Sequence, residues 1–438
     1  MASAKLTRTL SGNGNQNTAT WSFWVKRSGL TDTRMYASWY DGNNQFWIMF
    51  SDNKFNVKLY QSSSYSVSVE TNRLFRDTSA WYHIVVAIDT TQGTASDRVK
   101  IYVNGSQETD LGSTTYPSQN QSMPFGLATY NQRIGFRDAE EYLDGSISHY
   151  HFIDGTAYTP STFAESDSTS GIWKPKTAPS VTYGTNGFFL KFENSANMDL
   201  DSSPNNHTFT TGGTITQTQD TPSNNFATLN PLHKGDTLTG FTFANGNNTI
   251  TFGSTTYPYT FSTQAVSSGK WYAEFKVTAN PNDVSIGISN GEKSPYLSHS
   301  QYDYAYVGSN GNVQSNQSGS SYGSALSTND ILGVAMDLDN NRLFFSKNGT
   351  WQNSADPTSS TGAYTITAPS STTNGVYHFA VGDFNSAASS VQCNFGNGKF
   401  GTSSVASSNS DSAGLGLFEY SVPSGYYSLC TKNIKNYG

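Results

Sequence analysis

The chain has 438 residues, more than one hydrophobic core usually supports, so two domains are expected. Only 13% of the residues are charged, and the net charge of -7 comes without any cluster of Lys or Arg, which argues against a nucleic-acid partner. No segment approaches the roughly 20 apolar residues of a membrane span, and the first residues lack the apolar stretch of a signal peptide. We therefore expect synthesis in a cytoplasm and no membrane insertion.

Short segments of alternating apolar and polar residues follow one another through the N-terminal part of the chain. In residues 81–89, alternation places Ile84, Val86 and Ile88 on one face of a strand. Strands at this close spacing are typical of an antiparallel sandwich, and we assign residues 1–192 to one such domain. The predicted strands cover residues 20–26, 35–39, 45–50, 55–60, 66–70, 81–89, 99–103, 132–136, 143–155 and 183–192.

Residues 193–240 are rich in Asn, Ser, Thr and Pro and form the predicted connector. Within this segment Phe226, Leu229 and Leu232 are apolar, whereas a free tether carries few apolar side chains. We therefore expect an ordered linker that is docked and does not swing freely.

A second series of alternating strands occupies residues 241–400. Its hairpin at residues 330–349 repeats the pattern of residues 81–105, in which two strands are followed by an Asn-Gly turn. Residues 401–438 are expected to form a tail that packs through aromatic side chains. The predicted fold class is all-β, with two antiparallel β-sandwich (jelly-roll) domains joined by the ordered linker.

Cysteine usage excludes two kinds of site. Only Cys393 and Cys430 are present, too few for a disulfide framework or for a four-ligand zinc site. We interpret both as buried free thiols.

Two stretches resemble known domain families. Residues 269–396 resemble a SPRY domain, a bent β-sandwich used for protein interaction, through the ordered motifs GKWYAE (269–274), DILGV (330–334), KNG (347–349) and NFG (394–396). Residues 17–160 resemble concanavalin A-like, laminin-G-like jelly rolls through WSFWVK (21–26), WYH (81–83), YVNG (102–105) and LDG (143–145).

The combination resembles virion structural or tail-fibre proteins of marine and cyanobacterial phages. The motifs that carry this resemblance are FIDGTA (152–157), GIWKPK (171–176), YGTNGF (183–188), DTPSNNFATLNP (220–231) and LCT (429–431). The resemblance implies a non-enzymatic, lectin-like virion component. Because the chain lacks shaft repeats and an N-terminal anchor sequence, we expect a short spike or a surface-decorating subunit.

The partners that this resemblance implies are a host-surface glycan or protein, other virion proteins and further copies of the chain, for example in a trimer. The expected location is the surface or tail of the phage particle. The alternative is a purely structural cement or assembly subunit.

Aromatic side chains beside polar groups in loops are typical of saccharide recognition. Two sets fit this description, and the alternative for the first is a core Trp followed by a plain turn. The predicted ligand-binding residues are Trp39, Tyr40, Asp41 and Asn43 in the first domain, and Tyr296, Tyr302, Tyr304 and Trp351 in or beside loops at one end of the second.

A Ca²⁺ ion is the one cofactor that the sequence suggests, because laminin-G-like folds often hold one and the ion needs several oxygen ligands. The densest acidic run supplies Asp138, Glu141 and Asp144 as ligands. The alternative is a solvated loop, since no regular calcium-binding motif organises these residues. His149 and His151 alternate on one strand and would share a face, with a structural role favoured over metal binding.

Concanavalin A-like sandwiches also include glycanases, which use a pair of carboxylates. The sequence has no Glu-x-Asp-x-x-Glu arrangement, Gly-x-Ser-x-Gly elbow or His-Glu-x-x-His motif. We therefore expect a binding protein and not an enzyme.

Overall fold

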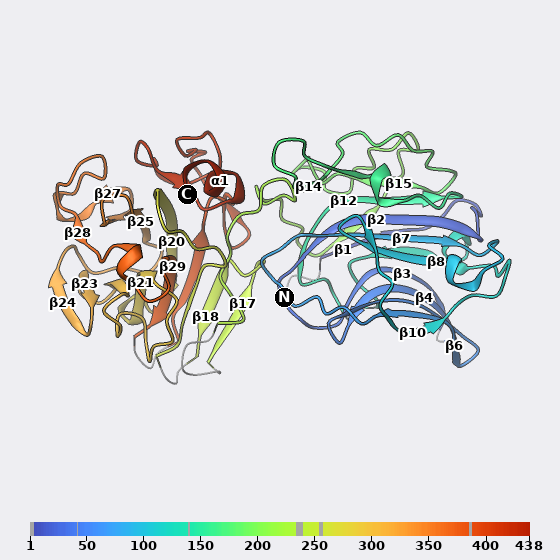
Figure 1. Ribbon diagram of the computed structural model, residues 1–438, viewed down its shortest axis with the longest axis horizontal. Coiled ribbons are helices and arrows are strands. Elements are labelled where there is room, and N and C mark those ends of the chain that lie inside the picture. The colour runs from blue at the N-terminus through green and yellow to red at the C-terminus, as the bar shows by residue number, and fades with distance from the viewer. Residues whose placement is uncertain (1–3, 42, 139–140, 234–239, 254–256, 385–387) are drawn as a thin grey trace. The chain divides into compact units, whose positions relative to one another are not determined.

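The computed structural model of the protein describes residues 4–41, 43–138, 141–233, 240–253, 257–384 and 388–438, and for residues 39–41 it describes the backbone alone. The chain divides into two compact units, unit 1 (Met1–Gln217) and unit 2 (Thr218–Gly438) (Figure 1). Strands in antiparallel sheets make up most of the regular structure of both units, which confirms the predicted all-β fold class. No helix in the described part of the chain has the length and apolarity needed to cross a membrane.

Unit 1 is a sandwich of two sheets, called sheet A and sheet B here. In spatial order, sheet A contains β10 (Leu111–Thr115), β6 (Ser64–Thr71), β5 (Lys54–Gln61), β4 (Asn44–Ser51), β3 (Thr33–Asp41), β11 (Asn131–Ile134), β1 (Lys5–Arg8) and β16 (Thr210–Gly212). Sheet B contains β15 (Phe188–Leu190), β12 (Gly145–Asp154), β2 (Thr18–Arg27), β7 (Tyr82–Asp89), β8 (Val99–Val103) and β9 (Ser106–Gln107). A separate ribbon pairs β13 (Ala164–Ser166) with β14 (Trp173–Pro175), and short 3-10 turns lie at η1 (Ala95–Asp97), η2 (Pro124–Gly126) and η3 (Pro160–Thr162).

Unit 2 is also a sandwich of two sheets, sheet C and sheet D. Sheet C contains β17 (Phe241–Ala244), β18 (Thr249–Phe252), β30 (Ser390–Asn394), β20 (Lys270–Ala279), β25 (Ile331–Asp337), β26 (Arg342–Lys347) and β27 (Thr350–Trp351), with β28 (Tyr364–Thr365) on β26 and β33 (Tyr427–Ser428) on β20. Sheet D contains β19 (Tyr259–Phe261), β29 (His378–Asp383), β21 (Val284–Ser289), β22 (Tyr304–Val307), β23 (Asn312–Ser315) and β24 (Ser318–Ser321). The remaining elements are β31 (Lys399–Phe400), β32 (Ser403–Ser404), η4 (Pro281–Asp283), η5 (Gln352–Ser354), η6 (Pro369–Ser371) and α1 (Thr431–Tyr437).

The repeated hairpin pattern has the same hydrogen bonds in both units. The side-chain oxygen of Asn104 accepts from the backbone N–H of His83 at 2.8 Å, and that of Asn348 accepts from Ile331 at 2.9 Å. Both turn residues have positive φ, 48° at Asn104 and 50° at Asn348, and the glycine after each is positive as well. This is the type I′ geometry that favours Asn-Gly in two-residue hairpins.

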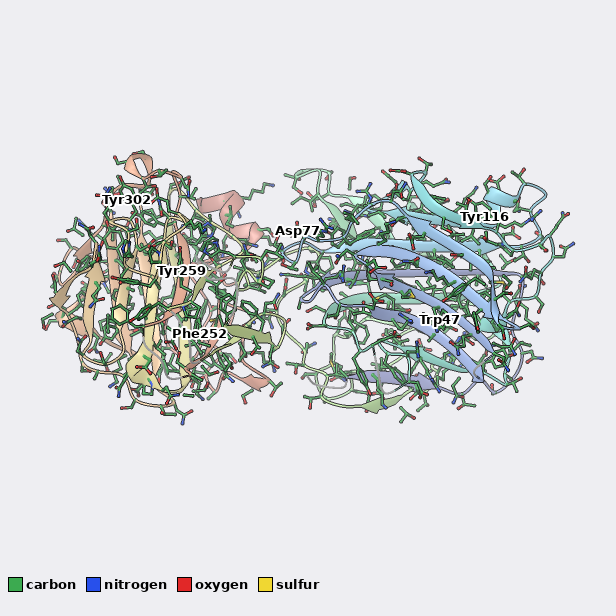
Figure 2. The ribbon with its side chains drawn as sticks, turned by 90° about the horizontal axis from the view of Figure 1, so that it is seen from below. Trp47, Asp77, Tyr116, Phe252, Tyr259 and Tyr302 are labelled. Atoms are coloured by element: carbon green, nitrogen blue, oxygen red, sulfur yellow. The ribbon has the colours of Figure 1, made fainter. Side chains whose placement is uncertain are left out.

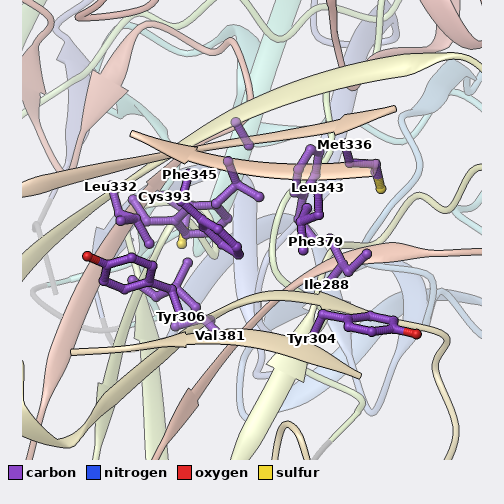
Figure 3. Packing of buried hydrophobic residues seen from close by; sticks show 14 of the residues in the cluster. Ile288, Tyr304, Tyr306, Leu332, Met336, Leu343, Phe345, Phe379, Val381 and Cys393 are labelled. Atoms are coloured by element: carbon purple, nitrogen blue, oxygen red, sulfur yellow. The ribbon is translucent and has the colours of Figure 1, made fainter. Parts of the chain in front are cut away.

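Each sandwich has its own hydrophobic core between its two sheets. In unit 1, Trp21 lies at the centre, with Tyr36, Phe125 and Phe152 within 5.1 Å of its ring centroid. In unit 2, Leu332, Phe345 and Phe379 lie among the core side chains together with Cys393 (Figure 3). Cys393 and Cys430 are both buried free thiols, as predicted.

The segments outside the expected sandwiches belong to the two units. Residues 193–217 of the predicted connector lie in unit 1, and residues 218–240 lie in unit 2. The expected tail, residues 401–438, also lies in unit 2, where Tyr426 and Leu429 are fully buried.

Three of the four sheets have an outer face that carries side chains from a covering segment. On sheet B, Phe163, Tyr183 and Trp173 of the segment between β12 and β15 pack onto strand residues. On sheet C, Phe418 and Tyr426 of the C-terminal segment pack onto Tyr272, Ala335 and Phe344. On sheet D, Leu297 packs onto Tyr259, Phe261, Ala305 and Ala380. Among the described residues, the apolar cluster on the outer face of sheet A contains only strand residues of that sheet, namely Ala37, Trp47, Met49 and Tyr60.

Candidate functional site

Three aromatic rings form a contact series on the outer face of sheet A. Trp47 lies on β4, Tyr60 on β5 and Tyr65 on β6, and Figure 2 shows Trp47 over these strands. The ring centroids of Trp47 and Tyr65 are 6.3 Å apart, and those of Tyr60 and Tyr65 are 5.3 Å apart in a T-shaped arrangement. Tyr65 is 50% exposed, whereas Trp47 is 6% exposed, so Tyr65 presents the accessible ring and Trp47 lies beneath the surface.

A β-bulge places Tyr65 on this face. Leu59 pairs with Val67, but the next pair is Tyr60 with Tyr65, so Ser66 is an extra residue in β6. Without the bulge, alternation from Val67 would direct Tyr65 into the core, because Val67 belongs to the core cluster. The bulge therefore re-aims one ring from the core to the surface.

Cationic side chains lie against two of these rings. The Nζ of Lys58 is 5.5 Å from the Tyr65 ring centroid, and the guanidinium of Arg34 is 5.2 Å from that of Trp47. Lys58 shares Glu70 with Lys54, at N–O distances of 3.9 and 2.9 Å. Both cations therefore lie in cation–π range of an aromatic face.

Several buried polar atoms beneath this surface have no hydrogen-bond partner. They are Nε and Nη1 of Arg34, Nε1 of Trp47, Oδ1 of Asn56 and Oε2 of Glu141. Burial lowers the pKa of Arg34, and its ion pair with Glu141 opposes this effect. Three of these five atoms are donors and two are acceptors, and the donors belong to the side chains of Arg34 and Trp47.

We refer to this set as the outer-face patch. It consists of Arg34, Trp47, Asn56, Lys58, Tyr60, Tyr65 and Glu70. An accessible aromatic ring beside charged donors suits a ligand that has both C–H faces and oxygen acceptors. Saccharides have this combination.

The predicted ligand residues of the first domain lie at the edge of this patch. The side chains of Trp39, Tyr40 and Asp41 are outside the described part of the structure, and the backbone of Trp39 pairs with Gln45 and Asn131. Asn43 is exposed, and its carbonyl oxygen accepts from the backbone N–H of Ser62 at 3.1 Å. The predicted turn therefore adjoins the turn between β5 and β6, close to Tyr60 and Tyr65 in sequence.

The structure corrects the prediction for Tyr304. This side chain is 5% exposed and lies in the core of unit 2 (Figure 3). Its hydroxyl donates to the Thr367 hydroxyl at 3.1 Å and accepts from the Thr367 backbone N–H at 2.9 Å. The reason is strand alternation, since Tyr304 and Tyr306 share the core face of β22.

The other predicted residues of the second domain do not form one contact cluster. Tyr296 is half-buried and packs against Tyr257 and Phe384, with both ring centroids 5.6 Å away. Trp351 instead packs against Tyr272 on the outer face of sheet C. Tyr302 is half-buried and lies at an edge of the sandwich in Figure 2.

Two of the three acidic residues predicted as calcium ligands form ion pairs with arginines. Glu141 pairs with Arg34 at 2.9 Å and with Arg137 at 3.5 Å, while Asp138 faces Arg133 at 3.8 Å. Burial raises the pKa of Asp144, whose backbone oxygen accepts from Ser28. Within the described ranges, no three His, Cys, Asp or Glu side chains form a group that could hold a metal ion.

Buried histidines of unit 1 contact the segment that covers sheet B. The Nδ1 of His83 accepts from Nε1–H of Trp173 at 3.0 Å, and the Nδ1 of His151 lies 3.1 Å from the Tyr183 hydroxyl. Burial lowers the pKa of His83 to about 3 and that of His151 well below its usual value. His149 and His151 both contact the ring of Phe189, which agrees with a shared face and a structural role.

Sequence reasoning missed most of the outer-face patch. Alternation along residues 45–50 and 55–60 would have separated Trp47, Lys58 and Tyr60 from the core residues. Alternation alone does not predict the position of Tyr65, because that position depends on the bulge. On unit 2, local patterns do not predict the packing of Tyr257 on Tyr296, because the two residues are distant in sequence.

Comparison with known families identifies one domain in each unit. Residues 3–164 match the Concanavalin A-like lectin/glucanases superfamily, and residues 270–396 match the SPRY domain. The chain therefore carries an N-terminal concanavalin A-like domain and a C-terminal SPRY domain, which confirms both predictions and suggests a carbohydrate- or protein-binding protein. No curated protein sequence matches the chain.

Several solved structures are similar to part of the chain. The SPRY domain of human HERC1 is 17% identical, with a TM-score of 0.31, and the match covers 38% of this chain and 96% of that one. Another human SPRY domain is 15% identical, with a TM-score of 0.27, over 35% of this chain and 94% of that one. Stonustoxin is 17% identical, with a TM-score of 0.29, over 38% of this chain and 27% of its own.

Proposed function

We propose that this protein is a non-enzymatic component of a phage virion that recognises a host-surface glycan or protein. It acts at the particle surface or tail, together with other virion proteins and further copies of itself. The outer-face patch of sheet A is the binding surface. The observation that carries the proposal is the half-exposed ring of Tyr65 beside Lys58, on a sheet face whose apolar cluster lacks a covering segment among the described residues.

The other three sheets of the protein support this assignment. Each has apolar or aromatic side chains on its outer face, and each is covered by a segment of the same chain. Exposed aromatic side chains cost free energy in water, so the half-exposed ring of Tyr65 is a natural site for a partner. The phage setting rests on the resemblance of the motifs between residues 152 and 231 to phage virion proteins.

The family name of the first domain covers both lectins and glucanases, so binding and cleavage require separate measurements. The purified chain should bind phage-host cells or their isolated envelope polysaccharide, and the polysaccharide should keep its chain length after prolonged incubation. Tyr65→Ala should weaken binding about tenfold or more, because stacking on an accessible ring is lost. Tyr437→Ala is a matched control, since Tyr437 is 39% exposed and lies in unit 2. Equal binding by the wild type and Tyr65→Ala would refute the assigned surface, and shortening of the polysaccharide would refute the non-enzymatic role.

A purely structural role is the second candidate, and one observation favours it. Tyr257, Tyr296 and Phe384 form an aromatic cluster on unit 2 in which Tyr257 is 48% exposed. Such a cluster suits an interface with another virion protein or a second copy of the chain. Phage particles that carry Tyr257→Ser would then adsorb normally but lose the subunit more easily in a dissociation assay.

A further inference from the structure

The charges around the outer-face patch repeat one arrangement on two sides of Trp47. On one side Glu70 is shared by Lys54 and Lys58, and on the other Glu141 is shared by Arg34 and Arg137. Among these described ion pairs, four cations therefore face two carboxylates. The carboxylate of Asp32 also acts on Arg34, so these groups carry one net positive charge on a protein whose overall charge is -7.

The excess charge lies in the same place as the rings. Lys58 contacts the ring of Tyr65, Arg34 contacts the ring of Trp47, and the two cations are two strands apart in sheet A. Neighbouring strands are about 4.8 Å apart, so their backbones lie roughly 10 Å from each other. Trp47 on β4 lies between the strands of the two cations, and Tyr65 on β6 lies beyond Lys58. A short saccharide segment can bridge this spacing.

Unpartnered donors add a second, independent indication. Arg34 is 4% exposed, and its Nε and Nη1 have no acceptor, although Glu141 pairs with the remaining nitrogen Nη2. Trp47 Nε1 also lacks an acceptor. Buried donors without acceptors are costly, and because these atoms are not exposed, negatively charged oxygens at this face would act on the Arg34 guanidinium through its positive field.

We propose that the outer-face patch binds an acidic saccharide, a glycan that carries carboxylate or sulfate groups. This inference rests on the proposed function and adds the charge class of the ligand. The sugar ring stacks on Tyr65, an acid group pairs with Lys58, and the positive field of Arg34 and Arg137 attracts the next acid group along the glycan. A neutral glycan would stack on the ring of Tyr65 but would not neutralise the excess positive charge.

The test compares charged and neutral forms of the same polymer. Polygalacturonate is paired with its fully methyl-esterified form, and dextran sulfate is paired with dextran, each titrated against the intact chain at low and high salt. We expect at least one of the two acidic polymers to bind at least about tenfold more tightly than its neutral counterpart, and salt to weaken that binding.

Variants separate this recognition from general attraction of a polyanion. Lys58→Gln should weaken binding of the acidic polymer about fivefold, and Tyr65→Ala should weaken it as well. The control Lys100→Gln removes a cation of sheet B that pairs with Asp97, and it should leave the affinity unchanged. Equal losses in Lys58→Gln and Lys100→Gln, or no loss in Tyr65→Ala, would overturn the proposal.

The remaining outcomes distinguish this proposal from the proposed function. If neither acidic polymer binds better than its neutral form while host cells still bind and Tyr65→Ala still weakens that binding, the acidic class is wrong and the binding surface stands. If Tyr65→Ala leaves host-cell binding unchanged, the proposed function and this inference fail together.

Discussion

The outer faces of sheet A and sheet C both carry aromatic side chains. A segment of the same chain packs over them on sheet C, but not, among the described residues, on sheet A. On sheet C, Tyr272 and Phe344 are fully buried because Phe418 and Tyr426 of the C-terminal segment pack over them. On sheet A, the ring of Tyr65 remains half-exposed. The difference indicates that aromatic residues on an outer sheet face have two distinct meanings, a contact within the chain or a surface for a partner.

The cover of sheet C is also attached by polar contacts. The buried carboxylate of Glu274 accepts from the backbone N–H groups of Glu419 and Tyr420, both at 2.9 Å. The carboxylate of Asp411 accepts from the backbone N–H of Ser428 at 2.8 Å and from Nδ2 of Asn433 at 2.7 Å. The C-terminal segment is therefore an integral part of the second sandwich, and truncation of the chain near residue 400 would expose a face that is normally covered.

The largest expected effect is on this cover. Phe418→Ala removes a fully buried ring that packs 5.1 Å from Tyr272, and should lower the free energy of unfolding of unit 2 by about 3–5 kcal/mol. Tyr65→Ala removes an exposed ring and should cost less than about 1 kcal/mol. Denaturant unfolding of both variants checks the contrast, and equal losses would remove the distinction between the two faces.

The next effect is the response of unit 1 to acid. Burial lowers the pKa of His83 to about 3 and also lowers the pKa of His151. As the pH falls, the unfolded chain therefore takes up protons at these residues before the folded chain does. Their contribution to stability is present above the unfolded pKa of about 6.5 and is lost as the pH falls. At a pH of about 5 we expect unit 1 to lose about 2 kcal/mol through His83, and His151 acts in the same direction. Hydrogen exchange around Trp173 against pH measures this loss, and flat protection would contradict it.

Glu274 should give the stability of unit 2 the opposite dependence on pH. Burial raises its pKa to about 7, so this carboxyl stabilises the folded state most below its unfolded pKa, and the contribution is lost as the pH rises through about 7. Between pH values of about 5 and 8 the loss should be of order 2 kcal/mol. Glu274→Gln should flatten this part of the profile in pH-dependent unfolding. A profile that the substitution does not change would show that another group controls it.

The smallest effect on folding belongs to the patch itself. Lys58→Gln removes one charge that is shared with Glu70 at 3.9 Å, so the free energy of unfolding should change by less than about 0.5 kcal/mol. Its binding to an acidic glycan should nevertheless fall. A variant that loses stability and binding in parallel would show that Lys58 acts through the fold.

Local patterns predicted the sandwiches well and the binding surface only in part. Alternation in residues 81–89 and 330–337 and the Asn-Gly turns depend on neighbouring residues, so the sequence contains the information directly. The same rule places Tyr304 in the core, where it lies, whereas its position beside a loop predicts a ligand contact. Tyr65 depends on a one-residue bulge and Phe418 on a long-range contact with Tyr272, and neither is visible in a local pattern.

The central claim is that the outer face of sheet A contacts the ligand, and hydroxyl-radical footprinting tests it without substituting any residue. With host envelope polysaccharide added to the intact chain, we predict strong protection of Tyr65 and unchanged reactivity of the exposed Tyr257 and Tyr437. Protection of Tyr257 with Tyr65 still fully reactive would contradict the account and move the binding surface to unit 2.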